Sequence, residues 1–254
     1  MFSVYSLCLD AWSPHYVRKL IQNMVDKVTP KLERLHALVI GPGLGRCPIV
    51  CEATARIISY AVSKQLPLVL DADALWMLAQ DQYRSLLEGY KRVVLTPNVV
   101  EYKRLMSKAD DNHDSCENDK DKDEESNPFR DATIVRKGHT DSIMKNGTEL
   151  YSCEETGGMK RSGGIGDVLA GTLGTLVAWN NILTNNGETE NNSTNTELDP
   201  LALSCWTACC FVKRATKKAF DEKKRSMTAP DVLENLGPAI DEMTTTSTEA
   251  SSKL

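Results

Sequence analysis

Three glycines and one carboxylate precede an apolar run in the stretch RSGGIGDVLAG, residues 161–171. The N–H groups that begin a helix lack partners within it, and the helix dipole adds partial positive charge. Gly163, Gly164 and Gly166 could therefore form an anion cradle. Asp167 would lie beside a bound phosphoryl group, where it could accept a proton from an attacking hydroxyl. Because Asp is also a preferred helix cap, this stretch alone leaves capping and catalysis both open.

Four other polar or glycine-rich segments each follow a short apolar run. They are GPGLG (41–45), DAD (71–73), TPN (96–98) and KGHTD (137–141). In open parallel sheets, ligands collect at the carboxyl ends of the strands, so we expect these segments to converge with the glycine stretch. The first is not the dinucleotide fingerprint GxGxxG, because Arg46 stands where the third glycine is required, and the chain contains no GxxxxGK[ST] P-loop.

Each of these segments also has a structural interpretation. GPGLG is equally typical of a plain strand-to-helix turn, and Asn98 and Glu101 stand at capping-box spacing, which favours a structural role. Asp71 and Asp73 could face magnesium or phosphate, or only solvent. Lys137 could contact a polyphosphate, although exposed lysines are common. The convergence of the segments is therefore a stronger indication than any one of them.

The elements that must position these residues alternate between strand and helix patterns. This alternation predicts an α/β fold with a mostly parallel central sheet flanked by helices on both faces. The helix that begins after Ser13 should cover the sheet, and Asn146-Gly147 predicts a hairpin. Strands are expected within 35–40, 67–73, 92–98 and 132–138, and helices within 14–28, 48–61, 165–179 and 201–220, with one more after Pro230.

Two segments, residues 107–130 and 184–199, are polar and nearly free of apolar side chains. Neither can bury enough apolar surface to order itself, so both are expected to be surface insertions. The remaining chain is predicted to form a single domain over residues 1–254.

Composition limits the classes of partner. The net charge is −5 and the basic residues are scattered, which argues against nucleic acid as a partner. No apolar run approaches the roughly 20 residues that span a bilayer, so no membrane partner is expected. The eight cysteines show no CxxC pair, which indicates reduced thiols. A cytoplasmic protein is expected; a mitochondrial form stays open if a targeting segment is missing, and so does a homo-oligomer.

Five motifs occur together in a recognisable order. They are VIGPGLGR, PLVLDADAL, VVLTPNVVEYKRL, IVRKGHTDSI and GGMKRSGGIGDVLAG. In these motifs the chain resembles the ATP-dependent NAD(P)H-hydrate dehydratases of the ribokinase-like superfamily, from about Leu35 to the C-terminal helices. Members of that family begin with a further strand and glycine-rich loop, so this chain is expected to be N-terminally short.

The resemblance implies a lyase that repairs damaged nicotinamide cofactor. ATP, with Mg²⁺ bridging its phosphates, would phosphorylate the ring hydroxyl of NADH or NADPH hydrate, and loss of phosphate would restore the cofactor. Asp167 would activate that hydroxyl, and no metal ligand is assigned. The residues expected at the hydrate are Gly45, Asn98, Val99, Val100, Glu101, Tyr102, Lys103, Arg104 and Asp167. Those expected at ATP are Lys137, Gly138, His139, Thr140, Asp141, Gly157, Gly158, Met159, Lys160, Arg161, Ser162, Gly163, Gly164, Ile165 and Gly166.

Two other functions stay open. One is a ribokinase-like kinase of another small alcohol, such as a vitamin precursor. The other is a non-catalytic, shortened protein that only binds nucleotide. The pair of motifs TPNVVEYKRL and KGHTD favours the dehydratase.

Overall fold

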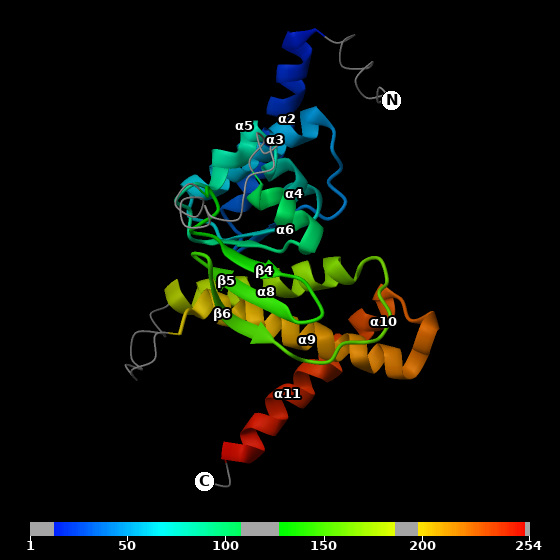
Figure 1. Cartoon of the computed structure of the whole chain (residues 1–254). Helices are drawn as coiled ribbons and strands as arrows, with labels where there is room; N and C mark the ends of the chain where they lie inside the picture. Colours follow the sequence, from blue (N-terminus) through cyan, green and yellow to red (C-terminus); the bar gives the residue numbers. More distant parts are fainter. Residues whose placement is uncertain (1–12, 108–126, 186–197, 252–254) are drawn as a thin grey trace, which may run out of the picture.

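The computed structural model describes residues 13–107, 127–185 and 198–251, and its strands form one mixed six-stranded sheet (Figure 1). The strands lie across the sheet in chain order. The first four run parallel, and the last two are antiparallel to their neighbours. The predicted α/β sheet is confirmed. Its strands are β1 (Leu38–Ile40), β2 (Leu68–Leu70), β3 (Val93–Leu95), β4 (Thr133–Arg136), β5 (Asp141–Lys145) and β6 (Thr148–Cys153).

The helices begin where the sequence supplies caps and prolines. Ser13 caps the first described helix by accepting a hydrogen bond from the Tyr16 N–H, and proline occupies the first turn of α2, α3, α9 and α10. The helices are α2 (Pro14–Leu32), α3 (Pro48–Ser63), α4 (Asp73–Leu78), α5 (Asp81–Arg84), α6 (Val99–Met106), α8 (Ile165–Asn185), α9 (Pro200–Lys223), α10 (Ala229–Glu234) and α11 (Leu236–Ser251). Two short 3₁₀ turns are η1 (Ser85–Leu87) and η2 (Lys224–Ser226).

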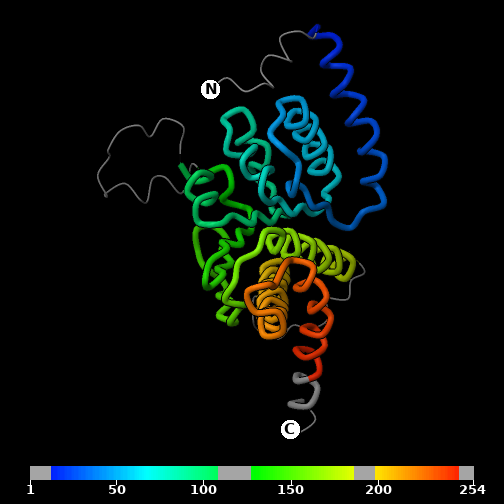
Figure 2. The backbone as a smooth tube through the Cα atoms, turned by 90° about the vertical axis from the view of Figure 1, so that its right-hand side faces the viewer, coloured from blue at the N-terminus to red at the C-terminus, as the bar shows by residue number. Residues whose placement is uncertain are grey.

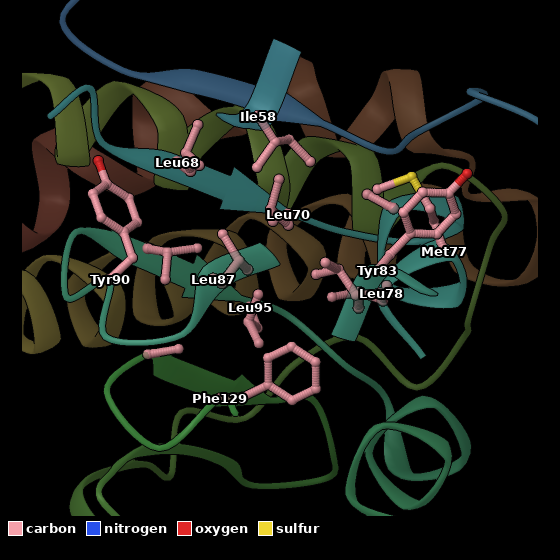
Figure 3. Packing of buried hydrophobic residues seen from close by; sticks show 14 of the residues in the cluster. Ile58, Leu68, Leu70, Met77, Leu78, Tyr83, Leu87, Tyr90, Leu95 and Phe129 are labelled. Carbon is pink, nitrogen blue, oxygen red and sulfur yellow. The ribbon is translucent and has the colours of Figure 1, made fainter. Parts of the chain in front are cut away.

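The two faces of the sheet bury alternate residues of the same strands. Leu68 and Leu70 of β2 pack with Ile58 of α3 in one cluster, as Figure 3 shows. Val69, between them, packs on the opposite face with Leu173 of α8. Successive side chains of a strand point to opposite faces, so a continuously apolar strand indicates that both faces are covered. Figure 2 shows α8 and α9 lying together on one side of the sheet, with α2 and α3 on the other.

The hairpin between β5 and β6 forms where it was predicted. Asn146 and Gly147 both have positive φ, 51° and 75°, as a two-residue turn of this kind requires. The hairpin adds two antiparallel strands beside β4 and so completes the sheet.

Two predictions about helices need correction. The first described helix packs chiefly on α3, where Ile21 and Val25 meet Ile49 and Ala53, and it reaches the core cluster on that face of the sheet only near its C-terminal end, through Leu32. The region around and after Pro230 holds two helices instead of one, since α10 ends at Glu234 with Asn235 as its C-cap, and α11 begins at Leu236.

Most of each expected insertion lies outside the described residues. Residues 108–126 and 186–197 lie outside the described part of the chain. Phe129 is fully buried beside Leu95 (Figure 3), so the end of the first segment belongs to the core. Thr184 and Asn185 belong to α8, while Asp199 caps α9 and pairs with Lys145 at 2.5 Å. Capping and burial therefore anchor the ends of both segments.

Candidate active site

Two charged side chains meet at the carboxyl edge of the sheet. Asp71 follows β2 and Lys137 follows β4, and the Lys137 Nζ donates a hydrogen bond to Asp71 Oδ1 at 2.7 Å. The Asp71 side chain is only 3% exposed. Because β3 lies between the two strands, the lysine side chain spans one strand to reach its partner. A buried carboxylate is tolerated where a cation compensates it, so each residue holds the other in place.

The first turn of α8 lies against this ion pair. A Cβ added at Gly166 would lie 3.8 Å from both Asp71 Oδ2 and Lys137 Nζ. Asp167 is the third residue of α8 and is exposed. Its carboxylate makes no hydrogen bond or ion pair with any other described residue, so it does not cap the helix. The free carboxylate of Asp167 thus stands next to Gly166, the residue that faces the Asp71–Lys137 ion pair.

The loop at residues 41–45 is fastened to the start of α4. The Gly45 N–H donates to Asp73 Oδ2 at 3.0 Å, and Arg46 Nε lies 3.2 Å from Asp73 Oδ1. Gly41 has a φ of +132°, and a Cβ there would lie 1.7 Å from the Asp71 carbonyl oxygen. Only glycine allows β1 and β2 to approach this closely before the loop.

The capping box at the start of α6 is confirmed. Asn98 Oδ1 accepts hydrogen bonds from the N–H groups of Val100 and Glu101, and the Glu101 carboxylate accepts one from the Asn98 N–H. Asn98 also bridges to Lys137, which joins this segment to the ion pair. Val99 and Val100 are 54% and 66% exposed, so an apolar surface stands at the edge of the site.

Further along α6, some side chains are exposed to solvent and others pack against the core. Lys103 and Arg104 are exposed. Tyr102 packs against the core, with the Arg136 guanidinium 5.7 Å from its ring centroid. The ring of Tyr102 therefore contributes to packing within the fold, although the residue was expected at the hydrate.

Lys213 of α9 contacts the turn at residues 137–141 and stabilises it. The Gly138 N–H donates to Asp141 Oδ1 at 2.8 Å, while Lys213 Nζ lies 3.5 Å from Asp141 Oδ2 and donates to the His139 carbonyl. Burial raises the pKa of Asp141, and the Gly138 N–H and Lys213 oppose that rise. His139 and Thr140 remain exposed. Sequence reasoning missed Lys213, although a lysine among apolar residues of a long helix was a usable signal.

The segment at residues 157–166 is also attached to α9. The Gly158 N–H donates to Thr216 Oγ1 at 3.0 Å, and Lys160 Nζ donates to the Met227 carbonyl at 2.6 Å. A Cβ at Gly158 would lie 2.5 Å from the Thr216 carbonyl oxygen, so this glycine is required for packing. Ile165, at the other end, packs against the core. Between these two attachments, Met159, Arg161 and Gly163 are exposed and Ser162 and Gly164 partly so.

The described residues contain no group of three His, Cys, Asp or Glu side chains placed to hold a metal ion. Their six cysteines are free thiols. Among the same residues, no helix is long and apolar enough to cross a bilayer.

Comparison with known proteins agrees with the motifs. A family model described as NAD(P)H-hydrate dehydratase matches residues 8–238. The ATP-dependent (S)-NAD(P)H-hydrate dehydratase of Schizosaccharomyces pombe is 38% identical over 226 residues, covering 86% of this chain and 65% of that protein. The human protein of the same name is 34% identical over 245 residues, covering 92% and 66%. The chain thus spans about two thirds of the length of these curated relatives.

A solved structure supports the fold. The Bacillus subtilis ADP/ATP-dependent NAD(P)H-hydrate dehydratase, co-crystallised with ATP/Mg²⁺, superimposes with a TM-score of 0.52 at 20% identity, over 82% of this chain and 64% of that one. This confirms the expected architecture, and the family model with its curated relatives establishes the kinship. The chain belongs to the NAD(P)H-hydrate dehydratase family.

Proposed function

We propose that this protein is an ATP-dependent NAD(P)H-hydrate dehydratase. The hydroxyl oxygen on the hydrated nicotinamide ring attacks the γ-phosphorus of ATP, and ADP leaves. The carbon–oxygen bond of the phosphorylated intermediate then breaks, phosphate departs and a ring proton is lost, which restores NADH or NADPH. The observation that supports this proposal most is the free carboxylate of Asp167 beside the Asp71–Lys137 ion pair.

The residues divide into two sides around Asp167. On the nucleotide side, the turn at 137–141 and the segment at 157–166 bind ATP through backbone N–H groups and Lys137. On the other side, Gly45 and residues 98–104 bind the hydrate. Asp167 accepts the proton of the ring hydroxyl as that oxygen attacks.

The side chains at the site fit a magnesium ion that arrives with ATP. Magnesium is commonly held by substrate phosphates, waters and one or two carboxylates, and not by a cage of protein ligands. Asp71 Oδ2 accepts no hydrogen bond from the described residues and faces Gly166, so Asp71 is the carboxylate that would hold it. When bound, the ion neutralises charge on the transferring phosphate.

The compartment that we propose is the cytoplasm. Free thiols are typical of reducing compartments, and the described cysteines are all free. Fractionation of cells with an antibody against the protein tests this proposal, and recovery in another compartment would overturn it.

The central test is the Asp167→Asn variant. With NADH hydrate and ATP, the wild-type chain is expected to restore absorbance at 340 nm, whereas Asp167→Asn is expected to lose nearly all of this activity because the proton acceptor is gone. The matched control is Asp241→Asn, which makes the same change at an exposed position of α11 and should leave activity unchanged. Substantial recovery by Asp167→Asn would remove Asp167 from its assigned role.

A substrate screen separates the alternatives. ADP release with other small alcohols, but not with the hydrates, would indicate a kinase. ATP binding without turnover of any substrate would indicate a protein that only binds nucleotide.

A further inference from the structure

The guanidinium of Arg46 is held by two side chains of α4. Arg46 Nε lies 3.2 Å from Asp73 Oδ1, and Arg46 Cζ lies 4.9 Å from the centroid of the Trp76 ring. The other oxygen of Asp73 accepts the hydrogen bond of the Gly45 N–H. Asp73 is the first residue of α4 and Trp76 follows one turn later, so one helical turn supports both the loop and the guanidinium. We call Arg46, Asp73 and Trp76 the Arg46 clamp.

The clamp uses little of the hydrogen-bonding capacity of Arg46. A guanidinium presents five N–H donors in one plane. Within the described residues its Nε makes the one hydrogen bond of this side chain, so the four donors of the two amino groups remain available. The side chain is 57% exposed. Exposed ion pairs contribute little to stability, so the needs of the fold do not account for this arrangement.

The surface beside the Arg46 clamp is formed by glycine backbone with open space above it. Gly43 and Gly45 have φ values of +67° and +77°, and a Cβ added at either would meet no atom within 4 Å. A ligand can therefore approach the backbone next to the guanidinium without displacing any side chain. An oriented arginine with both amino groups free matches the geometry of a phosphate, which it binds through two parallel hydrogen bonds.

We propose that Arg46 binds a phosphate group of the hydrated dinucleotide and is a specificity-determining residue of the substrate side of the site. This inference rests on the proposed function, which places the hydrate at Gly45. Both hydrates contain a pyrophosphate, and NADPH hydrate has one more phosphate on its ribose. A small alcohol that lacks phosphate cannot use this contact, so Arg46 selects for the dinucleotide.

The test is a kinetic comparison of wild type with Arg46→Ala. Loss of a charge-assisted contact is expected to raise KM for the hydrate about tenfold or more. The value of kcat and KM for ATP should each change less than about twofold, because such a contact serves ground state and transition state alike. Arg46→Lys keeps the charge but not the planar pair of donors, so its KM for the hydrate should lie between those of wild type and Arg46→Ala.

The KM values for the two hydrates show which phosphate group Arg46 contacts. A similar rise in KM for NADH hydrate and NADPH hydrate assigns the pyrophosphate to Arg46. A rise in KM for NADPH hydrate alone shows that Arg46 contacts the ribose phosphate. Both results support the proposal.

The matched control is Arg56→Ala. Arg56 lies on α3, its Nε is 2.9 Å from Glu52 Oε1, and its side chain is 41% exposed. It thus has the same kind of ion pair as Arg46 but lies away from the glycine loop, and its removal should leave every kinetic constant unchanged. The proposal is overturned if Arg46→Ala behaves like Arg56→Ala, or if it raises KM for ATP instead.

A binding measurement keeps this inference separate from the proposed function. Calorimetric titration with NADH and NADPH, which carry the same phosphates, does not depend on turnover. If the wild type binds them and Arg46→Ala binds at least about tenfold more weakly, Arg46 has its assigned role even if no hydrate is converted. Equal affinity in the two proteins, or no binding by wild type, overturns it. Equal thermal unfolding midpoints confirm that both variants are folded.

Discussion

The two glycine-rich loops of the site, residues 41–45 and 157–166, contain glycines of two kinds. In the first loop Gly41 is pressed against the Asp71 backbone, whereas Gly45 has open space where a side chain would stand. In the second loop Gly158 is pressed against α9, whereas Gly163 is open. The packed glycines hold each loop on the scaffold, and the open ones leave room for a ligand. A count of glycines therefore does not measure how much of a loop can contact substrate.

The loops also differ in how they are anchored. A single carboxylate, that of Asp73, binds the first loop through Gly45 and Arg46. The second loop and the neighbouring turn at 137–141 depend on α9, which reaches them through Thr216 and Lys213. The second loop and the turn at 137–141 therefore depend on α9, whereas the loop at 41–45 is held by the packing of Gly41 against Asp71 and by the Asp73 carboxylate.

The largest expected effect comes from Gly41→Ala. The new Cβ would overlap the Asp71 carbonyl oxygen, at 1.7 Å, and the backbone φ of +132° is strained for any other residue. We expect the free energy of unfolding to fall by about 3 kcal/mol or more. Urea unfolding followed by circular dichroism measures this loss. A loss below about 1 kcal/mol would show that β1 and β2 can separate, and that Gly41 does not hold the loop.

Gly158→Ala should have the next largest effect. Its Cβ would lie 2.5 Å from the Thr216 carbonyl oxygen and 2.9 Å from Phe220 Cβ, so we expect a loss of about 1–3 kcal/mol in unfolding free energy. Gly163→Ala is the matched control in the same loop, because no atom lies within 4 Å of its added Cβ. That control should change stability by less than about 0.5 kcal/mol. Equal effects in the two variants would contradict the distinction between packed and open glycines.

The smallest effect is expected from Lys213→Met, and it should depend on pH. Removing the cation leaves the buried Asp141 carboxylate with less compensation, which should cost about 1–2 kcal/mol at pH 7. Burial raises the folded pKa of Asp141 above its ordinary value of 3.8, and loss of Lys213 raises it further. A raised folded pKa adds stability that is complete below pH 3.8 and disappears as pH rises through the folded value.

The destabilisation by Lys213→Met should therefore shrink as pH falls from 7 toward 4. Urea unfolding of both proteins across this range measures the difference. A difference that stays constant with pH would show that Lys213 acts through packing alone, and that the turn at 137–141 does not depend on its charge.

Much of the fold could be predicted because its signals are local. Continuous apolar runs predicted the parallel strands, Asn146-Gly147 predicted the hairpin, and the spacing of Asn98 and Glu101 predicted the capping box. Each of these depends on backbone geometry and hydrogen bonds within a few residues. Phe129 shows the limit, since a single buried aromatic at the end of a polar segment leaves no periodic pattern.

The sequence by itself determined the order of strands and helices along the chain, and which loops follow the strands. It also placed Asp167 in the first turn of a largely apolar helix. Only the tertiary structure decided that Lys137 pairs with Asp71 and that Lys213 supports Asp141. It alone showed that Asp73 orients Arg46. The physical reason is that local propensity acts over a few residues, whereas these contacts join residues 27 to 72 positions apart, whose meeting depends on strand order and helix packing.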